Sequence, residues 1–390
     1  NSTAVYEVLL HDDMLMSVIG ALEYDPELRC HSVQHRAFLR DVACFREVVT
    51  FNDPVVVKKV KQNFHIGFLK DVVLPRALDD NTFAALIQLQ FYNNVNIISS
   101  LTNDSAFFVE LRAKLWPQAE EQQASVDYPQ VLLALRLLLE LCNVTKTMQL
   151  YHRAAFYRKA VENGFFDALA LVLEHTDSQL RLVAIDVLLA STLHDPCLLR
   201  HHVLSQRGSE SRMLAALLRV LTSGDPSGEK PQITEVLRAL LDPEGMEGRE
   251  QDDFLNLFYE KHVHELALPV AGQVQSGTGP MINGGGDAAP AKPDGEGGGG
   301  EEGKSDALCA AGPSGSSSGT EDLDGVLSAR QYVCELLCFC VAKHSYRIKY
   351  FILRNKILSK VLGLASHRDK CLVLAALRFF RTCVGLKDEF

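Results

Sequence analysis

The chain has 390 residues, of which 47% are hydrophobic and 23% charged, so it is too long for one compact core and has the composition of an ordinary folded protein. A net charge of −10 argues against direct nucleic-acid binding by the chain as a whole, and no uninterrupted apolar run approaches the roughly 20 residues of a membrane-spanning helix. The ten cysteines are scattered, which disfavours a disulfide framework, and we expect them to be reduced.

Short amphipathic helices separated by polar turns are predicted along most of the chain. The turns contain residues that end helices, such as Asn163-Gly164. Residues 55–60 are rich in valine and would suit a strand, although their lysines also permit a helix. The clearest helical segments are residues 83–100, 106–115, 131–142, 214–221, 233–241, 254–266 and 332–343.

Residues 271–325 differ from the rest of the chain in composition. They hold 16 of the 26 glycines, together with serine, proline and acidic residues. Such a segment cannot bury enough apolar surface to offset the entropy lost on ordering, so we predict a disordered loop. Helical patterning on both sides predicts helical repeats over residues 1–270 and repeats of the same array over residues 326–390.

An internal repeat indicates how these helices are arranged. The segment from Asn163 to Leu188 recurs 192 residues later, where His175-Thr176-Asp177 is matched by His367-Arg368-Asp369 and Ala184 by Ala376. Without the 55-residue loop the offset is 137 residues, or three units of about 46, which lies in the armadillo/HEAT range. We therefore predict an all-α, armadillo/HEAT-like α-solenoid with a disordered Gly-rich loop. An irregular helical bundle with one chance similarity is the alternative.

Catalytic and cofactor-binding motifs are missing from the sequence. It contains no phosphate-binding loop, no dinucleotide fingerprint and no nucleophile elbow, so we predict a chain that is not an enzyme and needs no cofactor. The run His11-Asp12-Asp13 could suggest a metal-dependent hydrolase, with His31, His35 or the His201-His202 pair as further ligands. The spacings match no metal motif, and we expect no bound metal.

A second group could be mistaken for a zinc site. Cys334, Cys338 and Cys340 precede His344, but the first two lie four residues apart within an apolar helical run. That spacing places both on one helix face, as core residues require. We expect these cysteines to pack in the core.

Two features could bind a partner protein. Residues 1–267 carry a net charge of −11, whereas residues 326–390 carry +8. The C-terminal bases form either a solvated face or a contact for an acidic partner segment; they are concentrated at Arg347, Lys349, Arg354, Lys356 and Lys360.

Asn93 and Asn94 form the second candidate, because polar amides in an apolar helix are costly unless they are hydrogen-bonded. They would either bind the backbone of an extended peptide or lie in a helix C-terminal turn.

Several ordered blocks resemble one known family. They are LLHDD at residues 9–13, LEYDP at 22–26, FYN at 91–93, LRALLDPE at 237–244, HSYRIK at 344–349 and GLKDEF at 385–390. Together these blocks resemble the central region of the SMEK family, the regulatory subunits of protein phosphatase 4. Neither the PH-like domain nor the acidic tail of such proteins falls within these residues, so the resemblance indicates a central module.

The resemblance implies a non-catalytic scaffold that joins the catalytic and scaffold subunits of protein phosphatase 4 and directs its choice of phosphoprotein substrates. It also implies a location in the nucleus and cytoplasm and no membrane association. A generic armadillo-repeat adaptor unrelated to phosphatases is the alternative reading of the same helical pattern.

Overall fold

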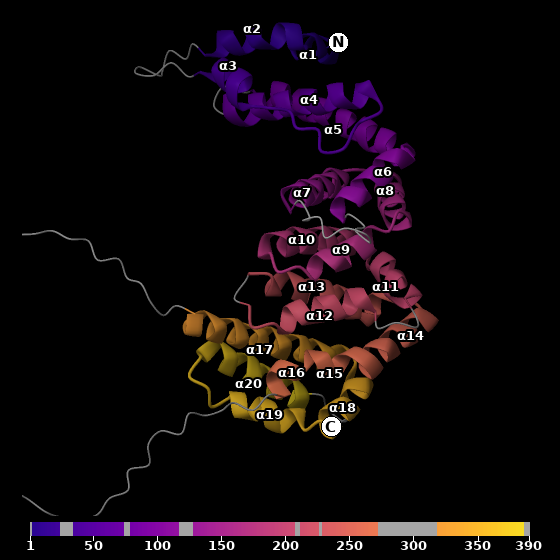
Figure 1. The fold of residues 1–390 in the computed structure, drawn as a ribbon, viewed down its shortest axis with the longest axis vertical. Helices are drawn as coiled ribbons and strands as arrows, with labels where there is room; N and C mark the ends of the chain where they lie inside the picture. Colours follow the sequence, from indigo (N-terminus) through magenta and orange to yellow (C-terminus); the bar gives the residue numbers. More distant parts are fainter. Residues whose placement is uncertain are drawn as a thin grey trace, which may run out of the picture.

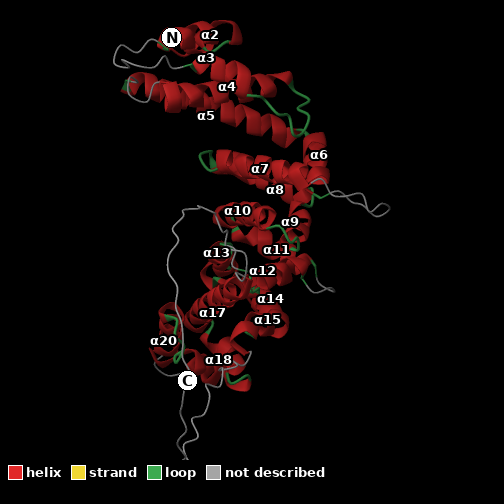
Figure 2. Cartoon of the chain, turned by 60° about the vertical axis from the view of Figure 1, so that its left-hand side comes forward, coloured by secondary structure: helices red, strands yellow, loops and turns green. Residues whose placement is uncertain are grey.

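A computed structural model of the chain describes residues 2–23, 34–73, 79–116, 128–206, 211–225, 228–271 and 318–385. The regular elements within these ranges are all helices, stacked along one long axis from the N-terminus to the C-terminus (Figures 1 and 2). The prediction of an all-α solenoid is confirmed.

The N-terminal third of the chain forms an irregular group of helices that ends in a long helix of the stack. Its elements are α1 (Ser2–Leu9), α2 (Asp12–Leu22), α3 (His35–Ala37), the π-helix η1 (Phe38–Val42), α4 (Pro54–Phe68), the π-helix η2 (Leu69–Val73), α5 (Asp80–Asn103), α6 (Ser105–Leu115) and α7 (Tyr128–Thr145).

Units of about three helices follow. The first unit consists of α8 (Leu150–Glu162), α9 (Phe165–Leu173) and α10 (Ser178–His194), and the second of α11 (Pro196–Ser205), α12 (Arg212–Thr222) and α13 (Lys230–Leu241). The third contains the 3-10 helix η3 (Pro243–Gly245), the contiguous elements α14 (Arg249–Leu257), the π-helix η4 (Phe258–His262) and α15 (Val263–Leu266), and then α16 (Leu268–Ala271) and α17 (Ser318–Lys343). The last consists of α18 (Ser345–Arg354), α19 (Ile357–Leu364) and α20 (Lys370–Gly385).

Aspartate caps fix the starts of several helices. The Asp53 side chain accepts a hydrogen bond from the Val55 N–H, and Pro54 occupies the first helical position. This start places residues 55–60 in α4, where Val56 and Ile66 are buried, so the ambiguous valine-rich segment is helical. Asp79, Asp104, Asp177 and Asp195 cap their helices in the same way.

The two copies of the repeat begin with the same turn. The Asn163 Nδ2 donates to the carbonyl oxygen four residues earlier at 2.8 Å, and the Asn355 Nδ2 makes the equivalent bond at 2.9 Å. The next residue is left-handed in both copies, with φ of 74° at Gly164 and 51° at Lys356. A left-handed residue suits glycine, so the lysine is the strained member of the pair.

The second turn of each copy is also equivalent. The Asp177 N–H donates to His175 Nδ1 at 3.0 Å, and the Asp369 N–H donates to His367 Nδ1 at 3.1 Å. Each aspartate then caps the following helix, α10 or α20. The repeat read from the sequence therefore corresponds to two helix–turn–helix segments with the same turn contacts.

Packing runs from unit to unit along one layer of the array. Helices α7, α10, α13, α17 and α20 pack in succession. One hydrophobic core extends from Val49 to Cys383, and a smaller core joins α2, α4 and α5 near the N-terminus. Each unit buries its apolar surface against its neighbours, as a solenoid requires.

The glycine-rich segment has different limits from those predicted. Helix α16 includes Ala271, and α17 begins at Ser318, so residues 318–325 of the predicted loop are helical. Residues 272–317 of that prediction lie outside the described residues.

One described helix, Asp324–Lys343 within α17, is long and apolar enough by length and composition to cross a membrane. Its Val333, Leu336, Leu337 and Cys340 side chains are fully buried in the main core. The helix packs against α12, α13 and α20, and this central position accounts for its hydropathy.

Candidate partner-binding surfaces

Asn93 is a residue of α5 whose side chain faces α4, and it is only 1% exposed. Its Nδ2 donates to Gln62 Oε1 at 2.9 Å and to Asn63 Oδ1 at 3.0 Å, and its Oδ1 accepts from Lys59 Nζ at 3.1 Å. The amide therefore joins two helices and is not presented at the surface. The helix continues to Asn103, so Asn93 does not lie in a C-terminal turn either.

Asn94 occupies a different position. Its Oδ1 accepts from Asn63 Nδ2 at 2.7 Å, and its side chain lines a cavity of about 500 Å³ between α4, α5 and α7. The two adjacent asparagines thus separate into one structural residue and one residue at a surface opening.

The predicted basic cluster lies on α18 and α19, but its members are not equivalent. Arg347 Nη2 lies 2.6 Å from Asp252 Oδ1, so its charge is already paired. Arg354 and Lys356 are exposed, and Lys349 and Lys360 are half-buried. None of these four has a carboxylate partner within the part of the chain that the structure describes. We call Lys349, Arg354, Lys356 and Lys360 the basic surface.

Exposed aromatic and aliphatic side chains lie on the same helix as part of the basic surface, and they were not among the predicted contacts. Tyr346, Tyr350 and Leu353 follow the four- and three-residue spacing of one helix face, and Tyr346 is 70% exposed. The Tyr346 and Tyr350 rings form an edge-on pair with centroids 5.4 Å apart. Aromatic residues and arginine are enriched at protein interfaces, so Tyr346, Tyr350 and Arg354 are the members of this region that best fit a contact.

The group that resembles a zinc site lies in the core. Cys334 and Cys340 are fully buried, and burial raises the pKa of both thiols to about 12. His344 uses both ring nitrogens, since Nε2 donates to the Leu241 carbonyl oxygen at 2.7 Å and Nδ1 accepts from the Tyr259 hydroxyl at 3.0 Å. This arrangement holds the imidazole neutral, and burial lowers the pKa of His344 to about 4.

The other metal hypothesis gains no support from the geometry. His31 lies outside the described residues, and His11 stands at the start of α2. Among the residues that the structure describes, no three His, Cys, Asp or Glu side chains approach closely enough to share a metal ion.

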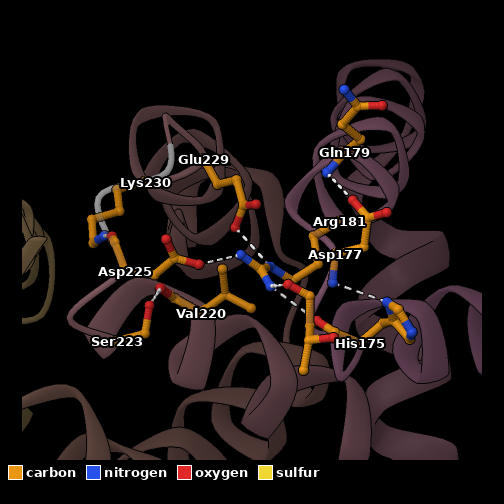
Figure 3. Close-up of polar contacts among 10 residues, drawn as sticks. His175, Asp177, Gln179, Arg181, Val220, Ser223, Asp225, Glu229 and Lys230 are labelled. Atoms are coloured by element: carbon orange, nitrogen blue, oxygen red, sulfur yellow. Dashed lines mark hydrogen bonds and ion pairs between the residues drawn. The ribbon is translucent and has the colours of Figure 1, made fainter. Parts of the chain in front are cut away.

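Arg181 on α10 is the centre of a buried ionic cluster (Figure 3). Its guanidinium lies 3.0 Å from Glu229 and 2.5 Å from Asp225, both in the segment before α13. It also donates to the carbonyl oxygens of His175 at 2.9 Å and Thr176 at 2.8 Å. The cluster ties the turn before α10 to the following unit, which is a structural role.

Arg200 on α11 performs a similar task one unit later. Its side chain is 0% exposed, and its Nε lies 3.0 Å from Glu250 Oε1. The same guanidinium donates to the carbonyl oxygens of Ala239 and Gly245. One side chain therefore connects α11 with α13, η3 and α14.

Comparison with known proteins gives one consistent result. A family model described as "Phosphatase 4 regulatory subunit 3" matches residues 1–390. Suppressor of Mek1 from Dictyostelium discoideum is 30% identical over the whole chain, and serine/threonine-protein phosphatase 4 regulatory subunit 3 from Drosophila melanogaster is 29% identical. Protein PPP4R3C1 from Mus musculus is 26% identical. The chain spans 34%, 36% and 44% of the lengths of these relatives.

Proposed function

The chain belongs to the phosphatase 4 regulatory subunit 3 family, and from this premise we propose that it is a non-catalytic scaffold of a protein phosphatase 4 complex. The observation that carries the proposal is that the family model matches the whole chain, residues 1–390. The resemblance to the SMEK family is thereby confirmed. A generic armadillo adaptor is not favoured, since relatives named for the phosphatase match every part of the chain.

The proposed partners are the catalytic and scaffold subunits of protein phosphatase 4, together with phosphoprotein substrates. A stacked helical array suits this work, because successive units present one extended surface to a large partner. We further propose that the chain works in the nucleus and cytoplasm, which imaging of the fluorescently tagged chain would test.

The basic surface is our candidate contact for an acidic part of that complex. Its four cations have no carboxylate partner among the described residues, whereas residues 1–267 carry a net charge of −11. An attractive field at one end of an acidic molecule accelerates association with a negatively charged segment. The exposed Tyr346 and Leu353 provide apolar area beside these charges.

We predict that reversing Arg354, Lys356 and Lys360 together to glutamate slows association with the reconstituted phosphatase 4 subunits by about tenfold at low salt. Each exposed charge pair contributes only roughly 0.2–1 kcal/mol, so single reversals should have small effects. Binding kinetics at low and moderate salt measure the change, and the triple variant should show a weaker salt dependence.

The matched control reverses Arg40, Lys58 and Arg158, three exposed cations outside the basic surface, which changes the net charge equally. If the triple variant and the control associate like the unmodified chain at both salt concentrations, the basic surface is a solvated face. If the unmodified chain does not bind at all, the proposed function itself is wrong.

A further inference from the structure

Two adjoining cavities lie along α4 and form a second surface, distant in sequence from the basic surface. Each has a volume of about 500 Å³, which is within the range of about 300–1,000 Å³ for ligand pockets. Val60 and Phe64 line both cavities, so the two openings meet on this face of α4. Figure 2 shows α4 and α5 as a separate layer next to α7.

The first cavity, which we call the amide groove, has an apolar floor and polar rims. Gln90 and Asn94 line it from α5, and Glu140 and Asn143 line it from α7. Asn94 Oδ1 already accepts from Asn63, and its amide nitrogen has no acceptor among the described residues. A carboxamide offers both donors and acceptors, which is what the backbone of an extended peptide requires.

The second cavity, which we call the basic groove, contains exposed aromatic rings and unpaired cations. Phe45 and Phe64 line it and are 44% and 48% exposed. Lys61 Nζ lies 5.5 Å from the centre of the Phe45 ring, and Arg46 stands on the same wall. Neither cation is within ion-pair distance of a carboxylate in the described part of the chain.

We propose that the two grooves together bind an extended segment of a partner protein, in which an apolar side chain lies next to acidic residues. The apolar side chain would pack on Val60 and Phe64, where the grooves meet. The carboxylates would lie over Arg46 and Lys61, and the backbone would be held by the amides of Gln90 and Asn94. This inference does not depend on the phosphatase proposal, since it uses only the chemistry of the grooves.

The charges also decide which groove receives the acidic residues of the segment. Glu140 on the wall of the amide groove repels a carboxylate, whereas Arg46 and Lys61 attract one at the other end. Acidic residues are therefore favoured at the basic groove and disfavoured beside Glu140, and a basic segment is opposed at the basic groove.

The test begins with a random peptide display library selected on the full 390-residue chain. Selected peptides should combine aspartate or glutamate with a neighbouring leucine, isoleucine or phenylalanine. In fluorescence anisotropy, the Arg46→Glu, Lys61→Glu double variant should raise the Kd of these peptides at least about tenfold. A peptide whose acids are replaced by lysine should regain affinity for the same variant.

The matched control is the Arg158→Glu, Arg381→Glu double variant, which changes net charge equally at two exposed arginines outside both grooves and outside the basic surface. It should bind the selected peptides like the unmodified chain. Equal weakening by both double variants, or selection without enrichment of acidic residues, would overturn the proposal. Self-association of the unmodified chain that the Arg46→Glu, Lys61→Glu variant abolishes would also overturn it, because the occupant would then be a second copy.

Discussion

Replacing Arg200 by alanine is expected to lower the free energy of unfolding by about 3–5 kcal/mol. The Arg200 side chain is fully buried and provides the ion pair to Glu250. Its removal leaves that carboxylate without its partner and leaves the carbonyl oxygens of Ala239 and Gly245 without this donor. Uncompensated buried polar groups carry the full cost of their desolvation, so the loss exceeds that of an ordinary surface change.

Arg249→Ala is the matched control for this prediction. Arg249 is 93% exposed and reaches Asp253 only at 4.0 Å, so its loss should change stability by no more than about 0.5 kcal/mol. Denaturant unfolding measures both variants, and hydrogen exchange should show the loosening in α11, η3 and α14. Equal midpoints for the two variants would mean that the Arg200 contacts do not hold these units together.

Acidification is expected to destabilise the chain through His344. Its pKa is lowered by burial from 6.5 to about 4, so the unfolded chain binds a proton more readily than the folded chain. The stability from the neutral ring is fully present above about pH 6.5 and is lost as the pH falls towards 4, by roughly 3 kcal/mol in total. The proton would have to enter at Nδ1, which already accepts from Tyr259.

His344→Gln is the variant that isolates this effect. Glutamine cannot be protonated in this range, so the variant should be less stable than the unmodified chain at neutral pH but should lose less stability between pH 6.5 and 4. Denaturant midpoints across that range give the two slopes. Identical slopes would show that His344 does not carry the pH dependence.

Local features of the fold could be predicted from the sequence because their causes are local. The turn residues Asn163, His175 and Asp177 bond to atoms within four residues, so the same pattern at Asn355 and His367 gave the same turns. Helix periodicity and capping also depend on neighbouring residues, which is why the all-α array was predicted correctly.

The long-range contacts could not be predicted. Arg181 reaches Glu229 across 48 residues, and Arg200 reaches Glu250 across 50, so no spacing in the sequence indicates either pair. The repeat itself was no guide, since Val373 stands where Arg181 would recur.

The candidate site was predicted only in outline. Asn93 and Asn94 look alike in the sequence, and only the position of α4 decides which amide is buried. The pairing of Arg347 with Asp252 likewise depends on how α14 packs near α18. The exposed aromatic face of α18 could have been predicted from the spacing of Tyr346, Tyr350 and Leu353, but only the charged residues of this segment were proposed as contacts.

The most direct test of the central claim is a dephosphorylation assay with three samples: the purified chain alone, the phosphatase 4 catalytic and scaffold subunits alone, and all of them together. We predict that the chain alone hydrolyses no phosphoester, and that its addition changes the rate on phosphoprotein substrates without changing the rate on a small phosphoester. Hydrolysis that follows the chain through gel filtration, or rates on phosphoproteins that do not respond to the chain, would contradict a non-catalytic scaffold that directs substrate choice.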